Sequence, residues 1–538
     1  MILIPCDGVQ VFTALNGATF ALLCSAGPML AGLAGCSAAP NEPVAIVLDI
    51  PNGPLEPKGA ATVEITLNSI TSNDEVFRTA NVSASGAFDI GEMPKSQAGR
   101  IEAALRSESG ALIGYGRSVE IVRFDQGGIA TVPVRRPMLY LGSGTSSFTT
   151  AGNGNPVTNG WVTRPAVVAD LSPDATAIGN SPRLGTNAGY LVAAAGTIYG
   201  LQQTIESDGR GSGAVTLVEL RSEDHALGPA RPIAVTGDIR EAAGSDDGQE
   251  IAVATSDGAW LVNVATGTTD RLASGAYDRI TIRDVGAASA QHEVFALASR
   301  VADYSNCTAV AKLERVTITT DTPNKTLIAM GAISDISTAN GRVFFSNVCT
   351  GKISEITATG TVEVRATGGH PTNLVASDAQ IWFSEIRGVA DRIFAVSSLV
   401  LSSNDPPRLL WQTPATLLVL TSEIEGVQRT LKPNNIELDE LTLISNEFVA
   451  LRTRMTFDVP RPVNTNLPRT AAQTDAAWII SAAGGAVVSN YQSWCEVLEA
   501  CGGADVCGWS CDAAAGISRP APGNEHRLRS LAATFQRR

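Results

Sequence analysis

The sequence predicts an almost entirely β protein: a small β-sandwich followed by a six- to eight-bladed β-propeller, with seven blades favoured. Three observations lead to this class. Short apolar runs bounded by Gly, Pro, Asn and Asp recur along the chain, which is typical of strands joined by turns. Almost no stretch sustains the 3.6-residue period of an amphipathic helix. In the larger, later part of the chain, a polar turn followed by a buried strand repeats at roughly the spacing of a propeller blade.

The first element is an apolar run over residues 11–33 that leads into Leu33-Ala34-Gly35-Cys36, which resembles a bacterial lipobox. The resemblance implies that residues 1–35 are a lipoprotein signal peptide and that an acylated Cys36 holds the chain on a lipid bilayer. Ser37 follows in place of Asp, which in this family favours the outer membrane, on either its periplasmic or its surface face. No Lys or Arg precedes Lys58, although signal peptides begin with positive charge. A retained anchor, a misplaced start and a buried segment therefore stay open as alternatives.

Composition limits the function of the rest. The chain has 538 residues, of which 44% are apolar and 17% charged, so it is globular with an ample core. Its net charge of −14 excludes a nucleic-acid partner, because such a partner requires a basic face to neutralise phosphates. No motif calls for a cofactor.

The second element is the sandwich, predicted over residues 45–136 after a tether at residues 36–44. Its strands are expected in alternating runs separated by turn residues. The segment 85–94, Ser-Gly-Ala-Phe-Asp-Ile-Gly-Glu-Met-Pro, resembles the turn and strand of immunoglobulin-like or transthyretin-like modules. Such modules usually space or bind, so the resemblance implies no catalytic role for this part.

The third element is the propeller, predicted over residues 137–485. Equivalent positions in four repeats are Ile251, Val294, Val343 and Ile381, separated by 43, 49 and 38 residues, close to the length of one blade. The Asp-Gly pairs at 247–248 and 257–258 suit the tight turns between strands, because Gly accepts positive φ. Trp260, Trp382, Trp411 and Trp478 lie in or beside apolar strands and are expected to pack between blades.

Two passages of the propeller resemble known repeats. Residues 245–267 resemble a WD40-like or YVTN-like blade, and residues 343–385 resemble NHL-type or virginiamycin B lyase-like repeats. In the lyase family, histidines and glutamates around the channel open a lactone with a divalent metal, and the resemblance implies such a role for His370 and Glu385. The chain has only four histidines and no cluster that could share proton transfer and metal binding, so no metal site is expected.

Six cysteines remain after Cys36, an even number that predicts disulfides in an exported chain. Cys307 and Cys349 follow equivalent strands of neighbouring blades, so we predict a bridge between them. The other four form a disulfide-rich element at residues 486–515, with their pairing open: Cys495, Cys501, Cys507 and Cys511. Zinc is the less favoured alternative, because paired C-x2-C spacing is absent. Residues 516–538 are either a loose tail or the strand that closes the ring.

The function expected from these observations is a non-enzymatic, membrane-anchored binding or scaffold protein of the cell envelope. Its partner would be a protein or an envelope polymer. The alternative is a propeller enzyme of the lyase or lactonase type, acting at the central channel through His370 and Glu385.

Overall fold

The structure is a computed structural model, and it describes the residues in the following ranges: 11–13, 44–69, 75–83, 88–91, 98–124, 128–148, 159–170, 183–184, 190–205, 211–221, 224–284, 292–319, 322–339, 341–357, 360–377, 379–388, 393–412, 420–424, 427–431, 435–459, 470–481, 487–492, 496–497 and 525–533. They form two compact units, one built mainly from Met1–Pro137 and the other mainly from Met138–Arg538. Within these ranges, no helix is long and apolar enough to cross a membrane.

The first unit is one mixed β-sheet whose order is β1-β2-β8-β6-β5-β3-β4, with β7 paired to β5. Its strands are β1 (Val11–Thr13), β2 (Val44–Asp49), β3 (Thr62–Ser69), β4 (Glu75–Asn81), β5 (Ala98–Arg106), β6 (Leu112–Arg117), β7 (Val122–Arg123) and β8 (Gly128–Arg135). Alternate residues of β2 and β3 are buried, because successive side chains of a strand point to opposite faces. The buried faces of β2, β3, β5 and β8 share a single apolar core. The immunoglobulin-like or transthyretin-like identity of this unit stays a prediction.

The second unit contains six four-stranded sheets and one five-stranded sheet within the described residues. We number these sheets as blades 1 to 7 around the ring. Blade 1 contains β9 (Met138–Phe148), β10 (Asn159–Asp170), β11 (Arg183–Leu184) and β39 (Glu525–Ala533), blade 2 contains β12 (Tyr190–Ala194), β13 (Thr197–Ile205), β14 (Gly211–Leu220) and β15 (Arg231–Ile233), and blade 3 contains β16 (Ile239–Gly244), β17 (Glu250–Thr255), β18 (Gly258–Asn263) and β19 (Thr269–Ser274).

The remaining blades follow in the same way. Blade 4 contains β20 (Arg279–Asp284), β21 (His292–Ala298), β22 (Ala311–Thr319) and β23 (Thr322–Gly331), and blade 5 contains β24 (Ile333–Ala339), β25 (Arg342–Asn347), β26 (Lys352–Thr357) and β27 (Gly360–Ala366). Blade 6 contains β28 (His370–Ala376), β29 (Gln380–Arg387), β30 (Ile393–Val400) and β31 (Arg408–Gln412), and blade 7 contains β34 (Asn435–Leu443), β35 (Phe448–Val459), β36 (Thr470–Ser481), β37 (Val487–Gln492) and β38 (Glu496–Val497). A hairpin of β32 (Leu420–Ile424) and β33 (Val427–Leu431) lies between blades 6 and 7 in the sequence.

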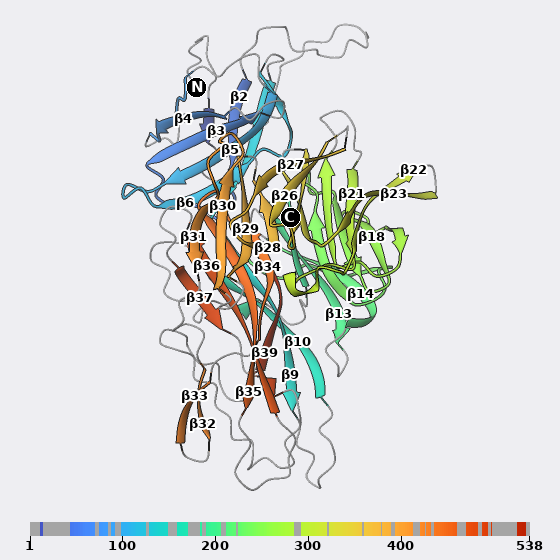
Figure 1. Cartoon of the computed structure of the whole chain (residues 1–538). Helices are drawn as coiled ribbons and strands as arrows, with labels where there is room; N and C mark the ends of the chain where they lie inside the picture. The colour runs from blue at the N-terminus through green and yellow to red at the C-terminus, as the bar shows by residue number, and fades with distance from the viewer. Residues whose placement is uncertain are drawn as a thin grey trace. The chain divides into compact units, whose positions relative to one another are not determined.

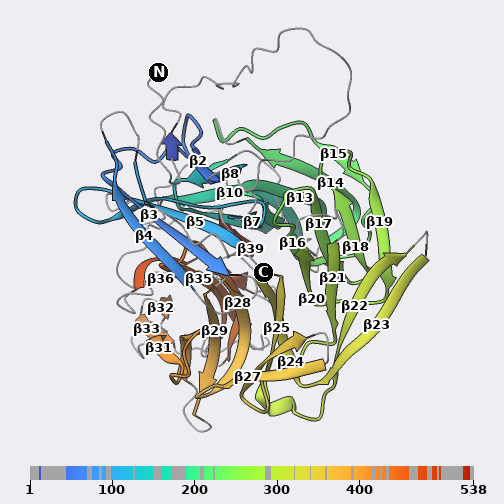
Figure 2. The same cartoon turned by 90° about the horizontal axis from the view of Figure 1, so that it is seen from above.

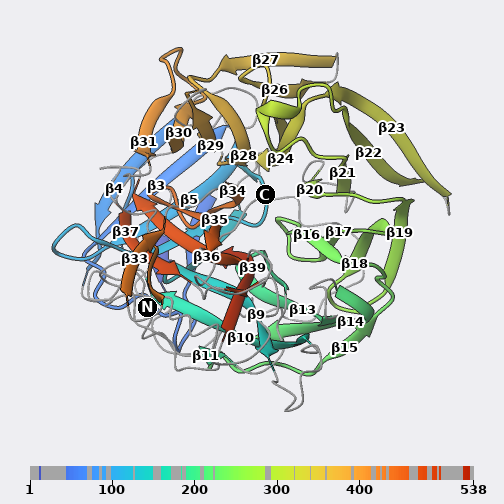
Figure 3. The same ribbon diagram turned by 60° about the horizontal axis from the view of Figure 1, so that its bottom comes forward.

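These sheets form a closed ring. Each blade has one inner strand, and the inner strands contact one another in the order β39, β12, β16, β20, β24, β28, β34 and back to β39. Figures 1 and 2 show the sheets side by side, and Figure 3 shows the inner strands β16, β20, β24 and β28 near the centre with β19, β23 and β27 on the rim. The predicted propeller is confirmed, with six four-stranded blades and a five-stranded sheet in the remaining position.

The ring is closed by the end of the chain. Strand β39 pairs antiparallel with β9 and supplies the inner strand of blade 1. Within residues 516–538 the structure describes β39, whose pairing with β9 is that of a closing strand. Because β9 and β39 pair, the ring closes only when strands from both ends of this unit come together.

The core of the propeller lies between its blades. Separate apolar clusters fill the junctions of blades 2 and 3, 3 and 4, 4 and 5, 5 and 6, 6 and 7, and 7 and 1. Trp260, Trp382, Trp411 and Trp478 are at most 6% exposed, and Trp411 packs on Trp478 across the junction of blades 6 and 7. The expectation that these tryptophans pack between blades is confirmed.

Candidate functional site

The inner strands of five blades share a β-bulge near the centre of the ring. In each of them, the pairing with the second strand shifts by one residue, and a bulge re-aims the side chains beside it. The residue after the bulge is polar and at most 6% exposed in every case. We call these five residues the clasp residues: Glu241, Asp335, Asn373, Glu440 and Ser530.

Each clasp residue forms a hydrogen bond with the backbone of the inner strand in the next blade. The N–H of Ile280 donates to Glu241 Oε2 at 2.8 Å, and a hydrogen bond to a charged group contributes about 1.5–3 kcal/mol. The other four bonds run from Leu374 N to Asp335 Oδ2 (2.8 Å), Asn373 Nδ2 to Leu438 O (2.9 Å), Leu531 N to Glu440 Oε1 (3.2 Å) and Leu191 N to Ser530 Oγ (2.8 Å). The clasp residues therefore tie neighbouring blades together around most of the ring.

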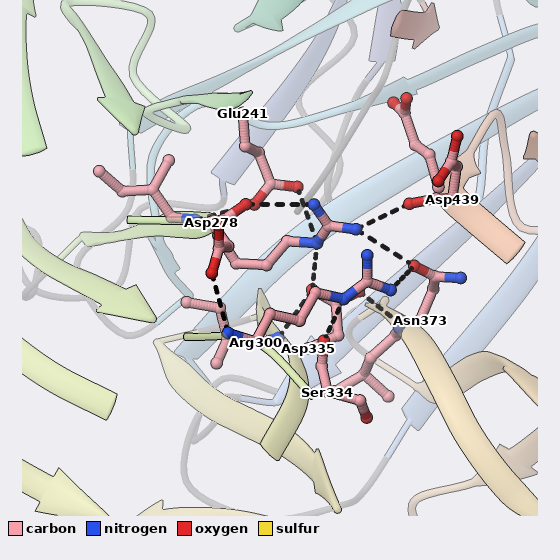
Figure 4. A network of polar contacts seen from close by, with 12 residues as sticks. Glu241, Asp278, Arg300, Ser334, Asp335, Asn373 and Asp439 are labelled. Atoms are coloured by element: carbon pink, nitrogen blue, oxygen red, sulfur yellow. Dashed lines mark hydrogen bonds and ion pairs between the residues drawn. The ribbon is translucent and has the colours of Figure 1, made fainter. Parts of the chain in front are cut away.

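Figure 4 shows the clasp residues Glu241, Asp335 and Asn373 in one polar network with Arg300 and Asp439. Arg279 of blade 4 belongs to this network. Its Nε is 3.2 Å from Asp335 Oδ1 and 3.8 Å from Glu241 Oε1. Its Nη2 donates to the carbonyl oxygen of Asp439 at 2.7 Å. Asp439 is the bulge residue of blade 7, so this one side chain joins blades 3, 4, 5 and 7.

Arg300, two residues after β21, completes the same pattern. Its Nε donates to the carbonyl of Ser334 at 2.7 Å, and its Nη2 donates to the carbonyl of Thr372 at 2.9 Å and to Asn373 Oδ1 at 2.7 Å. Ser334 and Thr372 are the bulge residues of blades 5 and 6. A bulge leaves ladder positions unpaired and buried carbonyls require a partner, so the arginines satisfy what the bulges leave open.

The network is balanced in charge. On blade 7, Arg452 lies 3.5 Å from Asp439 and 3.1 Å from Glu440, and Arg454 lies 3.6 Å from Asp439. On the opposite side, Arg240 pairs with Asp278. Five guanidinium groups therefore face five carboxylates, for a net charge of zero: Arg240, Arg279, Arg300, Arg452 and Arg454 with Glu241, Asp278, Asp335, Asp439 and Glu440.

The protonation states follow from this environment. Burial opposes the charge of Asp439, but Arg454 and Arg452 outweigh burial and lower its pKa to about 2. Burial also opposes the charge of Arg279, and the carboxylates of Glu241 and Asp335 raise its pKa above the usual value. Burial and the nearby charge of Arg279 lower the pKa of Arg300 to about 10. All three groups are therefore charged at neutral pH.

The space left in the network is small. Among its lining residues are Tyr190, Arg279, Asn373 and Arg452, and the free volume is about 10 Å³, roughly the room that one water molecule requires. A general acid or base works best with a pKa near the operating pH, and the pKa values of Asp439, Arg279 and Arg300 are not near neutral pH. In the part of the chain that the structure describes, no cluster of His, Cys, Asp and Glu could hold a metal ion.

His370 and Glu385 lie on paired strands outside this network. His370 pairs across the strands with Ile386, whereas Glu385 pairs with Pro371, so the two side chains start from opposite faces of the sheet. His370 Nδ1 is 2.8 Å from the carbonyl of Val348, and its ring stacks on Tyr304. Their role as a catalytic pair stays a prediction.

Glu385 is fully buried beside Arg387 and Ser397. Its Oε1 accepts hydrogen bonds from Arg387 Nε at 2.7 Å and from Ser397 Oγ at 2.5 Å. A Cβ on Gly369 would lie 2.8 Å from Oε2 and 2.8 Å from the backbone oxygen of Ile386, so a larger residue there would crowd this strand. The contacts of Glu385 are thus those of a packed ion pair within blade 6.

The predicted bridge between Cys307 and Cys349 is confirmed. It attaches the loop after β21 to the turn between β25 and β26 in blade 5. The same loop supplies Arg300 to the network and Tyr304, in the single-turn 3-10 helix Tyr304–Asn306, to the stack with His370. The other candidate cysteines, Cys36, Cys495, Cys501, Cys507 and Cys511, lie outside the described residues.

A histidine between two carboxylates links blades 3 and 4. His292 Nδ1 is 2.5 Å from Glu250 Oε2, its Nε2 is 3.3 Å from Asp247 Oδ2, and its side chain is 5% exposed. Burial opposes the charge of Asp247, but hydrogen bonds with His292 and Ser245 lower its pKa to about 2. Both ring nitrogens face carboxylate oxygens, an arrangement in which an imidazolium would donate from both of its N–H groups.

Sequence reasoning missed both the clasp residues and His292. A signal for the clasp residues exists in the repeat: a polar residue stands 8 to 10 positions before the equivalent buried position, as in Glu241 before Ile251, Asp335 before Val343 and Asn373 before Ile381. The arginines carry no such signal, because Arg279 and Arg300 come from one blade and have no counterparts in the repeat. No local pattern marks His292, which meets its partners only through the packing of two blades.

Comparison with known proteins identifies no family for the chain. No family model matches the chain, and no curated protein matches it. Among solved structures, it is similar to a chain of a nidogen–laminin complex (10% identity, 51% of this chain and 96% of that chain, TM-score 0.29). It is also similar to a hypothetical selenium-binding protein of Sulfolobus tokodaii (10% identity, 65% of this chain and 90% of that chain, TM-score 0.33). A third similar structure is a PQQ-bound aldose sugar dehydrogenase of Streptomyces coelicolor (10% identity, 47% of this chain and 94% of that chain, TM-score 0.27). Likeness at this level supports no activity for the chain.

Proposed function

We propose that the chain is a non-enzymatic binding platform, in which the propeller presents its faces and rim to a partner. The observation that carries the proposal is the filling of the channel. Charge-balanced side chains occupy the centre of the ring and leave room for about one water molecule. A substrate pocket normally encloses several hundred Å³, so the described residues around this network leave no place for an organic substrate.

The rigidity of the ring supports the same proposal. Clasp residues join the inner strands, and apolar clusters fill the junctions between blades. A rigid scaffold with exposed loops and rim strands holds a binding surface in a fixed shape, which lowers the entropic cost of association. The partner is a protein or an envelope polymer. The net charge of −14 opposes binding to nucleic acid.

We also propose that the platform is held in the cell envelope by an acylated Cys36. Stable membrane residence requires at least two anchoring signals, and a lipobox cysteine that carries several acyl chains provides them. Mass spectrometry of the N-terminal peptide from membrane fractions tests this part. We expect a chain that begins at acylated Cys36, and a mature chain that begins at Met1 would contradict it.

Crosslinking in intact cells tests the binding function. The tagged full chain is crosslinked in its native cells under several growth conditions, purified under denaturing conditions and examined for attached proteins and polymers. We expect one partner to be enriched reproducibly over a tag-only control. Absence of any enriched partner, together with turnover of a lactone panel by the purified chain that disappears in His370→Ala or Glu385→Gln, would contradict the proposal and favour the lyase or lactonase alternative.

A further inference from the structure

The outer strand of blade 4 differs from the other outer strands of the ring. β23 has 10 residues, whereas the described outer strands of the other blades, β11, β15, β19, β27, β31 and β37, have between two and seven. Figure 3 shows β23 on the rim of the ring. In the sheet order, β23 has β22 on one side and no described strand on the other, so its outer edge is open for pairing.

This strand carries large apolar side chains in solvent. Leu327 is 52% exposed, Met330 is 56% exposed and Val310, just before β22, is 49% exposed. Met330 lies opposite Lys312 and Leu327 lies opposite Glu314, and Val310 is two residues before Lys312. The side chains of Leu327 and Met330 therefore lie on one face of the β22–β23 pair, and Val310 stands next to its end. We call Val310, Leu327 and Met330 the rim patch.

The rim patch lies on the same strand face as residues of the apolar core between blades 3 and 4. Further along the same face, Val316 is buried in the core between blades 3 and 4, and Lys325 Nζ donates to Tyr277 Oη at 2.7 Å. Beyond that point the face is exposed to solvent at Leu327 and Met330. Isolated exposed apolar residues are ordinary on protein surfaces, whereas a group that lies together on one face marks an interaction site.

Lys312 carries the unpaired charge on the face of the rim patch. Its side chain is exposed and forms no hydrogen bond or ion pair within the described part of the chain. Glu314, opposite Leu327, and Lys325, opposite Val316, are on the same face, and they lie 3.6 Å apart and balance each other. A chain with a net charge of −14 thus places the unpaired positive charge of Lys312 beside its apolar rim strand. Complementarity then favours a partner segment that carries carboxylates.

We propose that β23 is a docking edge for an extended acidic segment of a partner protein. The segment pairs with the open backbone edge between Lys325 and Gly331, as in β-strand addition. Its apolar side chains pack on Leu327 and Met330, and its carboxylates meet Lys312. This inference rests on the proposed binding function and names the surface and the partner chemistry.

A peptide pair tests the docking edge. Fluorescein-labelled Val-Thr-Glu-Thr-Val-Thr-Glu, which places its valines and glutamates on one face of a strand, and its lysine counterpart, Val-Thr-Lys-Thr-Val-Thr-Lys, are titrated with the purified full chain and followed by fluorescence anisotropy. We expect the acidic peptide to bind at least 10-fold more tightly than the lysine peptide. Lys312→Gln should reduce this preference several-fold, and the double variant Leu327→Ser, Met330→Ser should weaken binding at least 10-fold.

Leu409→Ser is the matched control, because Leu409 is 39% exposed on the outer strand of blade 6. It should leave binding unchanged, and all variants should melt as the native chain does, since the altered side chains are exposed. Equal affinity for the two peptides, or equal loss with Leu409→Ser, would overturn the proposal. A dimer of the native chain that the double variant dissociates would instead assign the edge to a second copy and overturn the acidic partner. If cell crosslinking recovers a partner whose yield does not depend on Leu327 and Met330, the docking edge fails while the binding platform stands.

Discussion

The carboxylate of Glu241 on β16 accepts a hydrogen bond from the backbone N–H of Ile280 on β20 at 2.8 Å. The bond crosses from blade 3 to blade 4, and equivalent bonds cross four further junctions. Inner strands of neighbouring blades do not share a hydrogen-bonded ladder, so side chains must supply the polar contacts between them. A bulge followed by a buried acceptor or donor is the device that this chain uses.

Two replacements of Glu241 separate the contribution of its hydrogen bond from that of its charge. We expect Glu241→Ala to lower the free energy of unfolding by about 3 kcal/mol, because it leaves the N–H of Ile280 and part of the charge of Arg279 without a partner. Glu241→Gln keeps an acceptor oxygen and should cost less. Denaturant unfolding followed by fluorescence measures both. Asp270→Ala, at an exposed position of β19, is the control, and its free energy of unfolding should stay within about 0.5 kcal/mol of that of the native chain. An equal loss of stability in Glu241→Ala and Asp270→Ala would contradict the role of Glu241 in joining the blades.

Acid should weaken the network at Asp439. Its pKa is about 2 in the folded protein, below the usual value of about 3.9, so its contribution is present above pH 4 and is lost as the pH falls toward 2. The contribution is about 2 kcal/mol. Unfolding curves measured between pH 6 and 2 should show a steeper decline for the native chain than for Asp439→Asn. An equal decline of the free energy of unfolding in both chains would show that the arginine partners do not stabilise the ionised form of Asp439.

The imidazole of His292 should carry two protons at pH 7. Both of its nitrogens face carboxylates, and a neutral ring would place one lone pair against Asp247 or Glu250. Nitrogen-15 spectra of the four histidine rings measure this directly, with His292→Gln used for assignment. A neutral tautomer at pH 7 would contradict the geometry of this contact. His370 has a backbone carbonyl at Nδ1 and serves as the internal comparison.

The bridge between Cys307 and Cys349 should stabilise the propeller. It closes a loop with a sequence separation of 42 residues, and in the chain-entropy account such a loop is worth about 4 kcal/mol. We expect the double variant Cys307→Ser, Cys349→Ser to melt at a lower temperature and to expose the loop that carries Tyr304 to proteolysis. Native resistance to proteolysis in the double variant would show that the apolar contacts of Val301 and Tyr304 hold the loop without the bridge.

The sequence was sufficient for the class of fold and for one contact within it. Repeats of a polar turn and a buried strand indicated the blades, and the places of Cys307 and Cys349 in two successive repeats predicted their bridge. These features are local and recur, so they can be read along the chain. Assignment of the last residues to the closing strand required the structure, because pairing of β39 with β9 joins segments at opposite ends of the propeller.

The candidate site was harder to predict for a physical reason. Repeated His and Glu positions drew attention to His370 and Glu385, whereas the centre of the ring contains Arg279, Arg300 and the clasp residues. A bulge reverses which face a side chain takes, and the alternation of a strand in the sequence does not show where a bulge lies. Buried arginine and carboxylate side chains also look like surface charges until their partners from four other blades are known.

The free energy of unfolding of Arg279→Met shows whether the channel network holds the blades together. If the channel network holds the blades together, the variant leaves buried carboxylates without their cation and should lose about 3–5 kcal/mol, while the folded fraction still captures its partner in the crosslinking assay. A variant as stable as the native chain that no longer captures the partner, or that loses a turnover activity, would contradict the account. The arginine would then serve binding or catalysis, and the channel would be the functional site.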